Sequence, residues 1–342
     1  MNNIYEQFDG KSILVTGGTG SFGKAFLEKL FSVANPKRAV VFSRDELKQY
    51  EMQESRLFKG RQNLRFFIGD VRDQDRLRVA MREIDLVVHA AALKQVPAAE
   101  YNPMECIKTN IHGAESVINA AIDVGVGKVI ALSTDKAANP INLYGATKLA
   151  SDKLFVAANN MAGGQRTIFS VVRYGNVVGS RGSVVPLFSK LIKEGVGSLP
   201  ITDERMTRFW ITLMQGVDFV FQSFARMVGG EIFIPKIPSV RIVDVAHAMS
   251  PGSKIEIVGI RPGEKLHEIM CPSDDSHLTL EFKDHFVIRP SIRFHHTDID
   301  YSQNVLGEKG SQVPEGFEYQ SGTNPDFLDE KQIIDYNRLV GL

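Results

Sequence analysis

A glycine-rich turn near the amino terminus constrains the fold more than any other part of the sequence. An apolar run of strand length, Ser12–Thr16, leads into the string Thr16–Gly23, whose glycines are spaced as GxxGxxG, and a helix-forming stretch, Ser21–Ser32, follows at once. Small residues between a strand and a helix let backbone amides approach a pyrophosphate at the helix N-terminus. The turn therefore predicts a dinucleotide-binding unit. The residues expected to contact the dinucleotide are those of the turn itself: Gly17, Thr19, Gly20, Ser21, Phe22 and Gly23.

Strand-length apolar runs alternate with helix-length amphipathic stretches through the first half of the chain. The runs are nearly continuous in Val, Ile and Leu, which is typical of parallel strands covered by helices on both faces. The expected strands are Ser12–Thr16, Arg38–Phe42, Leu64–Ile68, Leu86–His89, Val129–Leu132 and Phe169–Arg173. The expected crossover helices are Ser21–Ser32, Gln74–Arg82, Met104–Val124 and Tyr144–Asn159. This alternation predicts an α/β fold with a doubly wound parallel sheet of the Rossmann type.

The second half of the chain is less regular, because prolines recur between shorter elements. A strand-like run, Glu231–Ile234, and a helical stretch, Ile242–Met249, are expected to return to the first domain. The tail from Phe294 has weak periodicity and is expected to be peripheral. We predict a dinucleotide-binding domain formed by residues 1–180 and 211–250, and a smaller mixed α/β substrate domain formed by residues 181–210 and 251–342.

Charge and composition exclude several classes of partner. The 40 Lys and Arg residues balance 40 Asp and Glu, so the formal net charge is zero and anions must be held by local sites rather than by general attraction. No stretch approaches the ~20 apolar residues that span a bilayer. The two cysteines, Cys106 and Cys271, lie far apart and suggest neither a disulfide framework nor a metal site. We therefore expect a cytoplasmic protein with no nucleic-acid partner, no membrane partner and no metal, and interpret the tail residues His295, His296 and Asp298 as solvated.

The end of the second expected strand indicates which dinucleotide is bound. NAD sites commonly place a carboxylate here for the ribose 2′-hydroxyl, whereas the 2′-phosphate of NADP needs a cation. Arg44 and Lys48 favour NADP, while Asp45, also expected near the ribose, leaves NAD open. Further cofactor contacts are expected where the second, third and fourth strands end, at Ser43, Asp70, Val71 and Ala90.

A tyrosine and a lysine, Tyr144 and Lys148, lie four positions apart and thus share one face of an expected helix. A lysine ammonium near a phenol lowers the pKa of the phenol, which makes the tyrosine a general base near neutral pH. Both side chains are also expected to contact the cofactor, Lys148 through the ribose. Such a pair is often a plain helix surface, but this one follows a strand that ends in Ser133–Lys136.

Taken together, these strings resemble the soluble UDP-N-acetylglucosamine 4,6-dehydratase (inverting) family of the extended short-chain dehydrogenase/reductase superfamily. The strings that carry the resemblance are Thr16–Gly23, Ser43–Lys48, Ser133–Pro140, Arg173–Val177, Met206–Phe209 and Arg261–Lys265. The resemblance extends from about Gly10 to Arg289. It implies NADP as cofactor, UDP-N-acetylglucosamine as substrate, the first step of pseudaminic acid biosynthesis, and a homo-oligomer, often a hexamer.

The resemblance also implies catalytic roles. Tyr144, supported by Lys148, takes the proton of the 4-hydroxyl as hydride leaves carbon 4. Where retaining 4,6-dehydratases carry Thr-Asp-Glu, this chain reads Thr134-Asp135-Lys136, so an amine replaces the base that handles the carbon 5 proton. Lys136 then removes that proton, Asp135 protonates the departing 6-hydroxyl, and Thr134 hydrogen-bonds the oxygen on carbon 4. A purely structural role, in which Lys136 pairs with Asp135 or a phosphate, remains open.

The substrate contacts are likewise carried over from the family. Arg208 and Arg261 are expected to bind the diphosphate, since guanidinium groups suit bidentate phosphate recognition. Glu264 is expected to accept from a ribose hydroxyl, Asn176 to bond a phosphate or the sugar, and Lys94 to reach the cofactor or the sugar. Without the resemblance, each arginine is equally an ordinary surface ion pair.

Two alternatives remain beside the inverting dehydratase. One is a retaining UDP-sugar 4,6-dehydratase or a UDP-sugar 4-epimerase on the same scaffold. The other is a dinucleotide-binding sensor without catalytic activity. Loss of the 6-hydroxyl distinguishes a dehydratase from an epimerase, and the configuration of carbon 5 distinguishes the two dehydratases. The presence of Asp135, Lys136, Tyr144 and Lys148 argues against a sensor.

Overall fold

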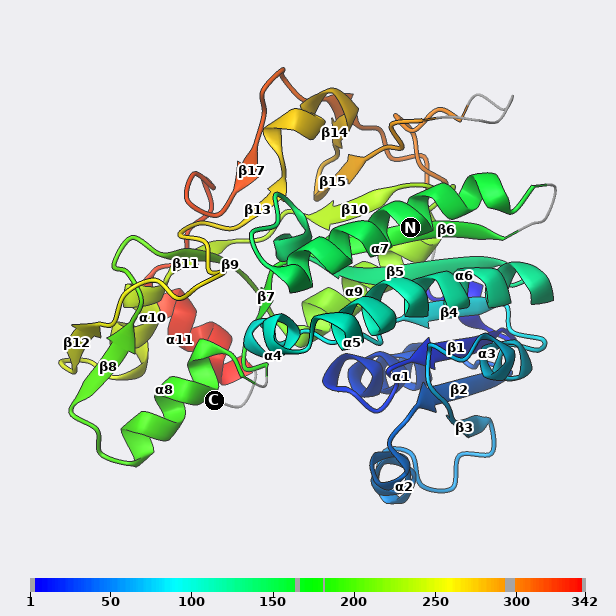
Figure 1. Cartoon of the computed structure of the whole chain (residues 1–342), viewed down its shortest axis with the longest axis horizontal. Coiled ribbons are helices and arrows are strands. Elements are labelled where there is room, and N and C mark those ends of the chain that lie inside the picture. Colours follow the sequence, from blue (N-terminus) through cyan, green and yellow to red (C-terminus); the bar gives the residue numbers. More distant parts are fainter. Residues whose placement is uncertain (1–3, 164–166, 181, 293–298, 340–342) are drawn as a thin grey trace.

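A parallel sheet forms the centre of the computed structural model, which describes residues 4–163, 167–180, 182–292 and 299–339 (Figure 1). Its parallel strands are β1 (Ser12–Thr16), β2 (Arg38–Ser43), β3 (Leu64–Ile68), β4 (Leu86–His89), β5 (Lys128–Thr134), β6 (Ile168–Tyr174) and β10 (Ile232–Pro235). Across the sheet they follow the order β10-β6-β5-β4-β1-β2-β3. This order reverses between β1 and β4, which confirms the predicted doubly wound parallel sheet.

Helices cover both faces of this sheet. They are α1 (Ser21–Val33), α2 (Glu46–Glu54), α3 (Gln74–Ala80), α6 (Gly113–Val124), α7 (Leu143–Met161) and α9 (Leu213–Arg226). Alternate residues of each strand enter different clusters, because successive side chains of a strand point to opposite faces. Leu14 joins the cluster that contains Val117 of α6, whereas Val15 joins the cluster that contains Phe26 of α1 and Phe221 of α9. The sheet is therefore buried on both faces, as its continuous apolar strands predict.

Three further strands extend the sheet beyond β10. They are β14 (Thr279–Glu281), β15 (His285–Ile288) and β16 (Ser311–Gln312), and they pair in an antiparallel manner. Residues expected in the substrate domain thus belong in part to the large sheet. The prediction that the tail from Phe294 is peripheral is wrong, because Tyr319, Leu328 and Ile333 are buried. These apolar residues are widely spaced and fill gaps between other elements, so they produce no periodic signal.

A smaller group of elements lies beside the sheet, at the end where α7 begins (Figure 1). Its helices are α8 (Val184–Lys193), α10 (Ile242–Met249) and α11 (Glu330–Leu339). Its strand pairs are β8 (Ser198–Ile201) with β12 (Lys254–Ile257), β9 (Thr207–Ile211) with β7 (Asn176–Val177) and β11 (Ser239–Arg241), and β13 (Ile269–Cys271) with β17 (Tyr319–Gln320). The three helices and the strands β8, β9 and β11 enclose a core that includes Phe188, Leu199 and Trp210. Buried residues of β13 and β17 belong instead to the core cluster of the large sheet.

Short helices complete the chain: α4 (Val96–Tyr101), α5 (Pro103–Ile107), a π-helical turn (Lys108–His112) and 3₁₀ turns at Glu6–Phe8, Asp135–Ala137 and Ser273–Leu278. None of the helices in the described ranges is long and apolar enough to cross a membrane.

Candidate active site

The glycine turn after β1 forms a cradle that fits a diphosphate. Gly17 has a φ of +66°, and a Cβ there would lie 3.0 Å from the backbone of Ala91. At Gly23 a Cβ would lie 2.5 Å from the Cα of Gly18, so helix α1 approaches the turn as closely as the sequence spacing predicts. The first turn of α1 has no side-chain cap, which leaves its amide groups available to an anion.

The ends of β1 and β4 are held together behind this cradle. The Thr16 hydroxyl accepts hydrogen bonds from the amides of Ala90 and Ala91 at 3.2 and 3.3 Å, and lies 2.8 Å from Nδ1 of His89. Burial, and then the charge of Lys148, lower the pKa of His89 to about 3, so this imidazole is neutral. Thr16 therefore fixes the loop that begins at Ala90, one of the expected cofactor contacts.

The end of β2 carries a mixed set of charges. Asp45 accepts the Lys48 amide at 3.0 Å and its side chain pairs with the Lys48 ammonium at 2.6 Å, so this carboxylate caps helix α2. The Arg44 guanidinium is about half exposed and lies 3.7 Å from Oδ2 of Asp70. Asp70 in turn binds Arg72 at 2.7 Å. The expected cofactor residues at the ends of the second and third strands are thus neighbours. Of the cations Arg44, Lys48 and Arg72, Arg44 has the longest ion-pair distance.

An acid–ammonium cluster lies where β5 ends. The Thr134 hydroxyl donates to Oδ1 of Asp135 at 2.8 Å, and Nζ of Lys136 lies 3.2 Å from the same oxygen. The ammonium of Lys136 also lies 3.1 Å from Oε1 of Glu268, which is 3.8 Å from Nε of Arg208. Asp135 and Glu268 are almost fully buried, and Lys136 is one quarter exposed. Asp135 and Lys136, expected at the carbon 5 step, are therefore in contact with each other and with Thr134, expected at the oxygen on carbon 4.

The electrostatics of this cluster keep a proton within it. Burial raises the pKa of Asp135, and the charge of Glu268 raises it further, while Lys136 opposes both. Burial works against the ammonium of Lys136, but the adjacent carboxylates Asp135 and Glu268 outweigh it and hold the pKa of Lys136 above its usual value. At neutral pH Lys136 is therefore an ammonium. To remove a proton from a sugar it must first pass its own proton on, and Oδ1 of Asp135 is in reach to receive it.

Helix α7 carries Tyr144 and Lys148 to this cluster. Asn142 caps the helix by accepting the Gly145 amide at 2.8 Å, and its Nδ2 donates to the carbonyl oxygen of Gly263 at 2.8 Å. A Cβ at Gly145 would overlap the carbonyl oxygen of Lys136, so the close approach of α7 to that segment requires glycine. The Tyr144 hydroxyl hydrogen-bonds the side chain of Thr134.

The pKa of Tyr144 differs from the sequence-based expectation. Burial raises the pKa of this phenol to about 12, while the charge of Lys136 and the hydrogen bond with Thr134 partly oppose the rise. The expected lowering by Lys148 is therefore wrong in this structure: burial is the dominant influence on the phenol, and its nearby cation is Lys136. Burial also lowers the pKa of Lys148, and only the charge of Asp152 counteracts it.

Several buried polar residues that were not predicted from the sequence support the site. Asp152 binds the Ser133 hydroxyl at 2.8 Å and Arg173 at 3.1 Å. Asn110, in the π-helical turn, holds both the amide and the carbonyl of Leu93 at 2.8 and 2.9 Å. Asp152 could have been found, because it follows Lys148 by four positions and shares its helix face. Asn110 and Glu268 have no local pattern and meet the site only through the fold.

The expected substrate residues lie on four different segments. Arg208 is buried beside Glu268, and its Nη1 donates to the carbonyl oxygens of Thr207 and Leu266. The Arg261 guanidinium lies 3.7 Å from Glu264, on the loop that Asn142 anchors through Gly263. The amide oxygen of Asn176 is buried without a hydrogen-bond partner among the described residues, and the Lys94 side chain is exposed on the loop after β4.

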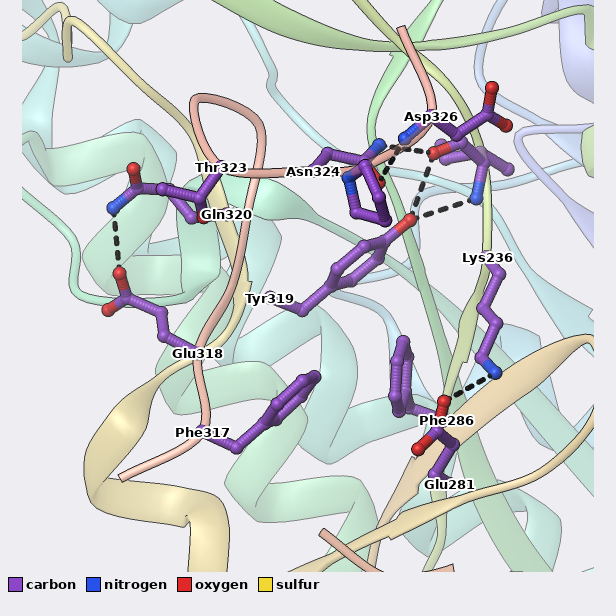
Figure 2. A pocket seen from close by; sticks show the side chains of 12 residues that line it. Lys236, Glu281, Phe286, Phe317, Glu318, Tyr319, Gln320, Thr323, Asn324 and Asp326 are labelled. Atoms are coloured by element: carbon purple, nitrogen blue, oxygen red, sulfur yellow. Dashed lines mark hydrogen bonds and ion pairs between the residues drawn. The ribbon is translucent and has the colours of Figure 1, made fainter. Parts of the chain in front are cut away.

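A pocket of about 400 Å³ lies elsewhere, between β10 and the segment of β17 (Figure 2). Several of its polar groups are paired within the protein: the Tyr319 hydroxyl bonds both backbone groups of Ile237 at 2.9 Å, and Lys236 pairs with Glu281 at 2.7 Å (Figure 2). None of the residues expected at the active site lines it. The described residues also contain no cluster suited to a metal ion, and His295, His296 and Asp298 lie outside them.

Comparisons with known proteins agree with this architecture. A family model described as polysaccharide biosynthesis protein matches residues 13–290. The UDP-N-acetylglucosamine 4,6-dehydratase (inverting) of Campylobacter jejuni subsp. jejuni serotype O:23/36 (strain 81-176) is 62% identical over 328 residues, which cover 96% of this chain and 97% of that protein. A UDP-glucose 4-epimerase of Rickettsia akari (strain Hartford) is 46% identical over 275 residues, covering 78% and 80%. The X-ray structure of Pen from Bacillus thuringiensis superimposes with a TM-score of 0.86 at 36% identity, covering 98% and 99%.

Proposed function

Since the chain belongs to the polysaccharide biosynthesis protein family, and within it to the inverting UDP-N-acetylglucosamine 4,6-dehydratases, we propose that it removes water from UDP-N-acetylglucosamine and inverts carbon 5. The observation that carries the proposal is the contact between Lys136, Asp135 and Glu268 beside Tyr144. The product would be UDP-2-acetamido-2,6-dideoxy-β-L-arabino-hex-4-ulose. We further propose that this hydro-lyase reaction opens pseudaminic acid biosynthesis.

Tyr144 and its neighbours perform the first half of the proposed reaction. Tyr144, in its phenolate form, takes the proton of the 4-hydroxyl, and Thr134, already bonded to the phenol, contacts the oxygen on carbon 4. Lys148 binds the cofactor ribose, and the charge of Asp152 favours its ammonium form against burial. When bound on the glycine turn Gly17–Gly23, NADP⁺ would supply the acceptor for the hydride of carbon 4 and the donor for carbon 6. A ketone at carbon 4 makes the neighbouring proton on carbon 5 acidic, which prepares the second half.

Asp135 and Lys136 perform the second half. Transfer of one proton from Nζ of Lys136 to Oδ1 of Asp135, across 3.2 Å, turns the ion pair into an amine and a carboxylic acid. The amine removes the carbon 5 proton, and the acid protonates the departing 6-hydroxyl, so that water leaves. The raised pKa of Asp135 lowers the cost of this transfer, while the raised pKa of Lys136 keeps the ion pair as the resting form. A proton delivered to the opposite face of carbon 5 by a donor other than Lys136, such as water, inverts that centre.

The substrate residues provide the local cations that a neutral protein needs for a diphosphate. We propose that Arg208 and Arg261 bind the phosphates, that Glu264 accepts from the uridine ribose, and that Lys94 contacts the sugar or the cofactor. The unpartnered amide oxygen of Asn176 is suited to accept from the sugar. We also propose the division into a cofactor domain (1–180 and 211–250) and a substrate domain (181–210 and 251–342), with the exceptions that β14, β15 and β16 extend the large sheet and that α10 packs in the smaller group. We propose assembly as a homo-oligomer, by family resemblance a hexamer.

The choice of NADP over NAD depends on Arg44 in this proposal. We expect Arg44→Ala to raise the Kd for NADP⁺ at least ~10-fold and to change the Kd for NAD⁺ little, because a charged hydrogen bond to a phosphate contributes about 1.5–3 kcal/mol. Titration of both cofactors, followed by intrinsic fluorescence, measures this difference. Arg56→Ala, an exposed arginine beyond α2, is the matched control. An equal rise in the Kd values for NADP⁺ and NAD⁺ would show that Arg44 does not contact the 2′-phosphate.

A UDP-sugar 4-epimerase is the second candidate, since a protein of that name is 46% identical to this chain. The decisive experiment is incubation of the purified protein with UDP-N-acetylglucosamine and NADP⁺, followed by NMR of the sugar. We expect a 4-keto product with a methyl group at carbon 6 and the L-arabino configuration. A methyl signal with the retained configuration would support a retaining dehydratase instead. A 4-epimer without a methyl group would support an epimerase, and an unchanged sugar would support a dinucleotide-binding sensor.

A further inference from the structure

Glu268 stands out among the buried charged groups because the proposed mechanism does not use it. Its carboxylate is only 2% exposed, and one oxygen, Oε1, contacts two cations, Lys136 at 3.1 Å and Arg208 at 3.8 Å. The other oxygen, Oε2, is buried and has no hydrogen-bond partner among the described residues. An ionised carboxylate is costly to bury unless its charge serves its neighbours.

The backbone fixes Glu268 in this position independently of its charge. Its amide donates to the Ser321 hydroxyl at 2.9 Å, and its carbonyl oxygen accepts the Ser321 amide at 2.8 Å. The Ser321 hydroxyl also lies 2.7 Å from that of Thr207, next to Arg208 on β9. The segment before β13 thus presents Glu268 to the turn that follows β5, and it does so through bonds that a change of side chain leaves in place.

We propose that Glu268 is a positioning residue that keeps one proton within the Asp135–Lys136 pair. The inference rests on the proposed dehydratase function, in which that pair supplies both the base and the acid. The Lys136 ammonium bridges two buried carboxylates, so the cluster carries one proton and two negative charges. The charge of Glu268 makes it unfavourable to lose that proton to solvent, whether it resides on Nζ of Lys136 or on Oδ1 of Asp135.

The other charges around the cluster come from four elements. Arg208 on β9 and Lys265 before β13 are cations that favour release of the proton, and each interacts with Glu268. Tyr144 on α7 is neutral, because its pKa is raised to about 12. Arg173 on β6 is paired with Asp152. Glu268 is therefore the one anion, besides Asp135 itself, that the structure places against Lys136 within the described ranges.

The pH profile of dehydration tests the proposal. Neutralising Glu268 removes a negative charge that stabilises the protonated pair, so the shared proton is lost at lower pH. We expect Glu268→Gln to move the alkaline limb of kcat down by about one pH unit or more, whereas Glu268→Asp keeps the limb near that of the wild type. Glu281→Gln, which breaks the Lys236–Glu281 pair of 2.7 Å, is the matched control and should leave the profile unchanged.

Two further measurements separate this role from a structural one. Transient reduction of the cofactor, followed by absorbance, reports the carbon 4 step and should be preserved in Glu268→Gln. Acetylation of Lys136 by acetic anhydride at pH 9, quantified by peptide mass spectrometry, should be about tenfold faster in that variant, because more amine is present. Should Glu268→Gln not fold, Glu268→Thr provides a second uncharged side chain with the same expected shifts.

The outcomes are distinct. An unchanged alkaline limb together with an unchanged acetylation rate in a folded, uncharged variant would overturn the role of Glu268. Acetylation needs no substrate, so it tests the link between Glu268 and Lys136 even if the wild-type protein forms no 4-keto product. If the wild-type protein forms no 4-keto product, the proposed dehydratase function is refuted, while the link between Glu268 and Lys136 is still decided by the acetylation rates.

Discussion

Replacing Tyr144 with phenylalanine is expected to lower the rate of carbon 4 oxidation by about a thousandfold, since general base catalysis contributes ~10²–10⁴-fold. The variant keeps the ring and loses only the hydroxyl that hydrogen-bonds Thr134. Transient reduction of bound NADP⁺, followed by absorbance after mixing with UDP-N-acetylglucosamine, measures this step directly. Dehydration should fall by the same factor, because the 4-ketone must form before carbon 5 becomes acidic.

The pH dependence of the same step carries its own expectation. A phenol whose pKa is raised to about 12 is almost entirely protonated at neutral pH. Because the phenolate is the active base, the rate of carbon 4 oxidation should rise with pH through the neutral range in the wild type. The rise should be absent in Tyr144→Phe.

An exposed tyrosine gives the control for this variant. Tyr50→Phe removes a hydroxyl from the surface of α2 and should leave the rate of cofactor reduction unchanged. Normal reduction in Tyr144→Phe would exclude Tyr144 as the base and would direct attention to Thr134, the hydroxyl closest to it in the hydrogen-bond network.

The local parts of the site were predictable because each has a pattern within a few residues. The turn Thr16–Gly23 must combine a positive φ at Gly17 with close approach at Gly23, and only glycines at that spacing allow both. The parallel strands were predictable from their continuous apolar runs, because both faces of the sheet are buried. Tyr144 and Lys148 were predictable as a pair because residues four positions apart share one face of a helix.

The parts that escaped prediction depend on contacts between distant segments. Glu268 reaches Lys136 only because the fold packs β13 against the turn Asp135–Ala137 that follows β5, and no spacing in the sequence records that contact. The direction of the Tyr144 pKa shift was wrong for a related reason, since burial depends on the whole fold. Likewise, β14 to β16 are short strands of two to four residues, too short to show a period.

Replacing Lys136 with alanine is expected to have an effect as large as that of Tyr144→Phe, but on a different step. Exchange of the carbon 5 proton with deuterated water should fall by about a thousandfold, because among the described residues Lys136 is the amine within ion-pair distance of both Asp135 and Glu268. Cofactor reduction at carbon 4 should persist at a lower rate, since Tyr144 and Lys148 are retained but the Lys136 charge that lowers the pKa of Tyr144 is lost. NMR of the sugar in deuterated water measures the first quantity, and absorbance measures the second.

Chemical rescue distinguishes a missing base from a disturbed site. Removal of the lysine leaves two buried carboxylates without their shared cation, so one of them is expected to take up a proton. Ethylamine added to Lys136→Ala should fill the vacated volume and restore part of the carbon 5 exchange, increasingly so at alkaline pH, where the free amine is more abundant. Lys153→Ala, on the exposed face of α7, should exchange as the wild type does. Normal exchange in Lys136→Ala without added amine would mean that a carboxylate is the base, and the amine that replaces the glutamate of the retaining enzymes would then serve only to neutralise Asp135 and Glu268.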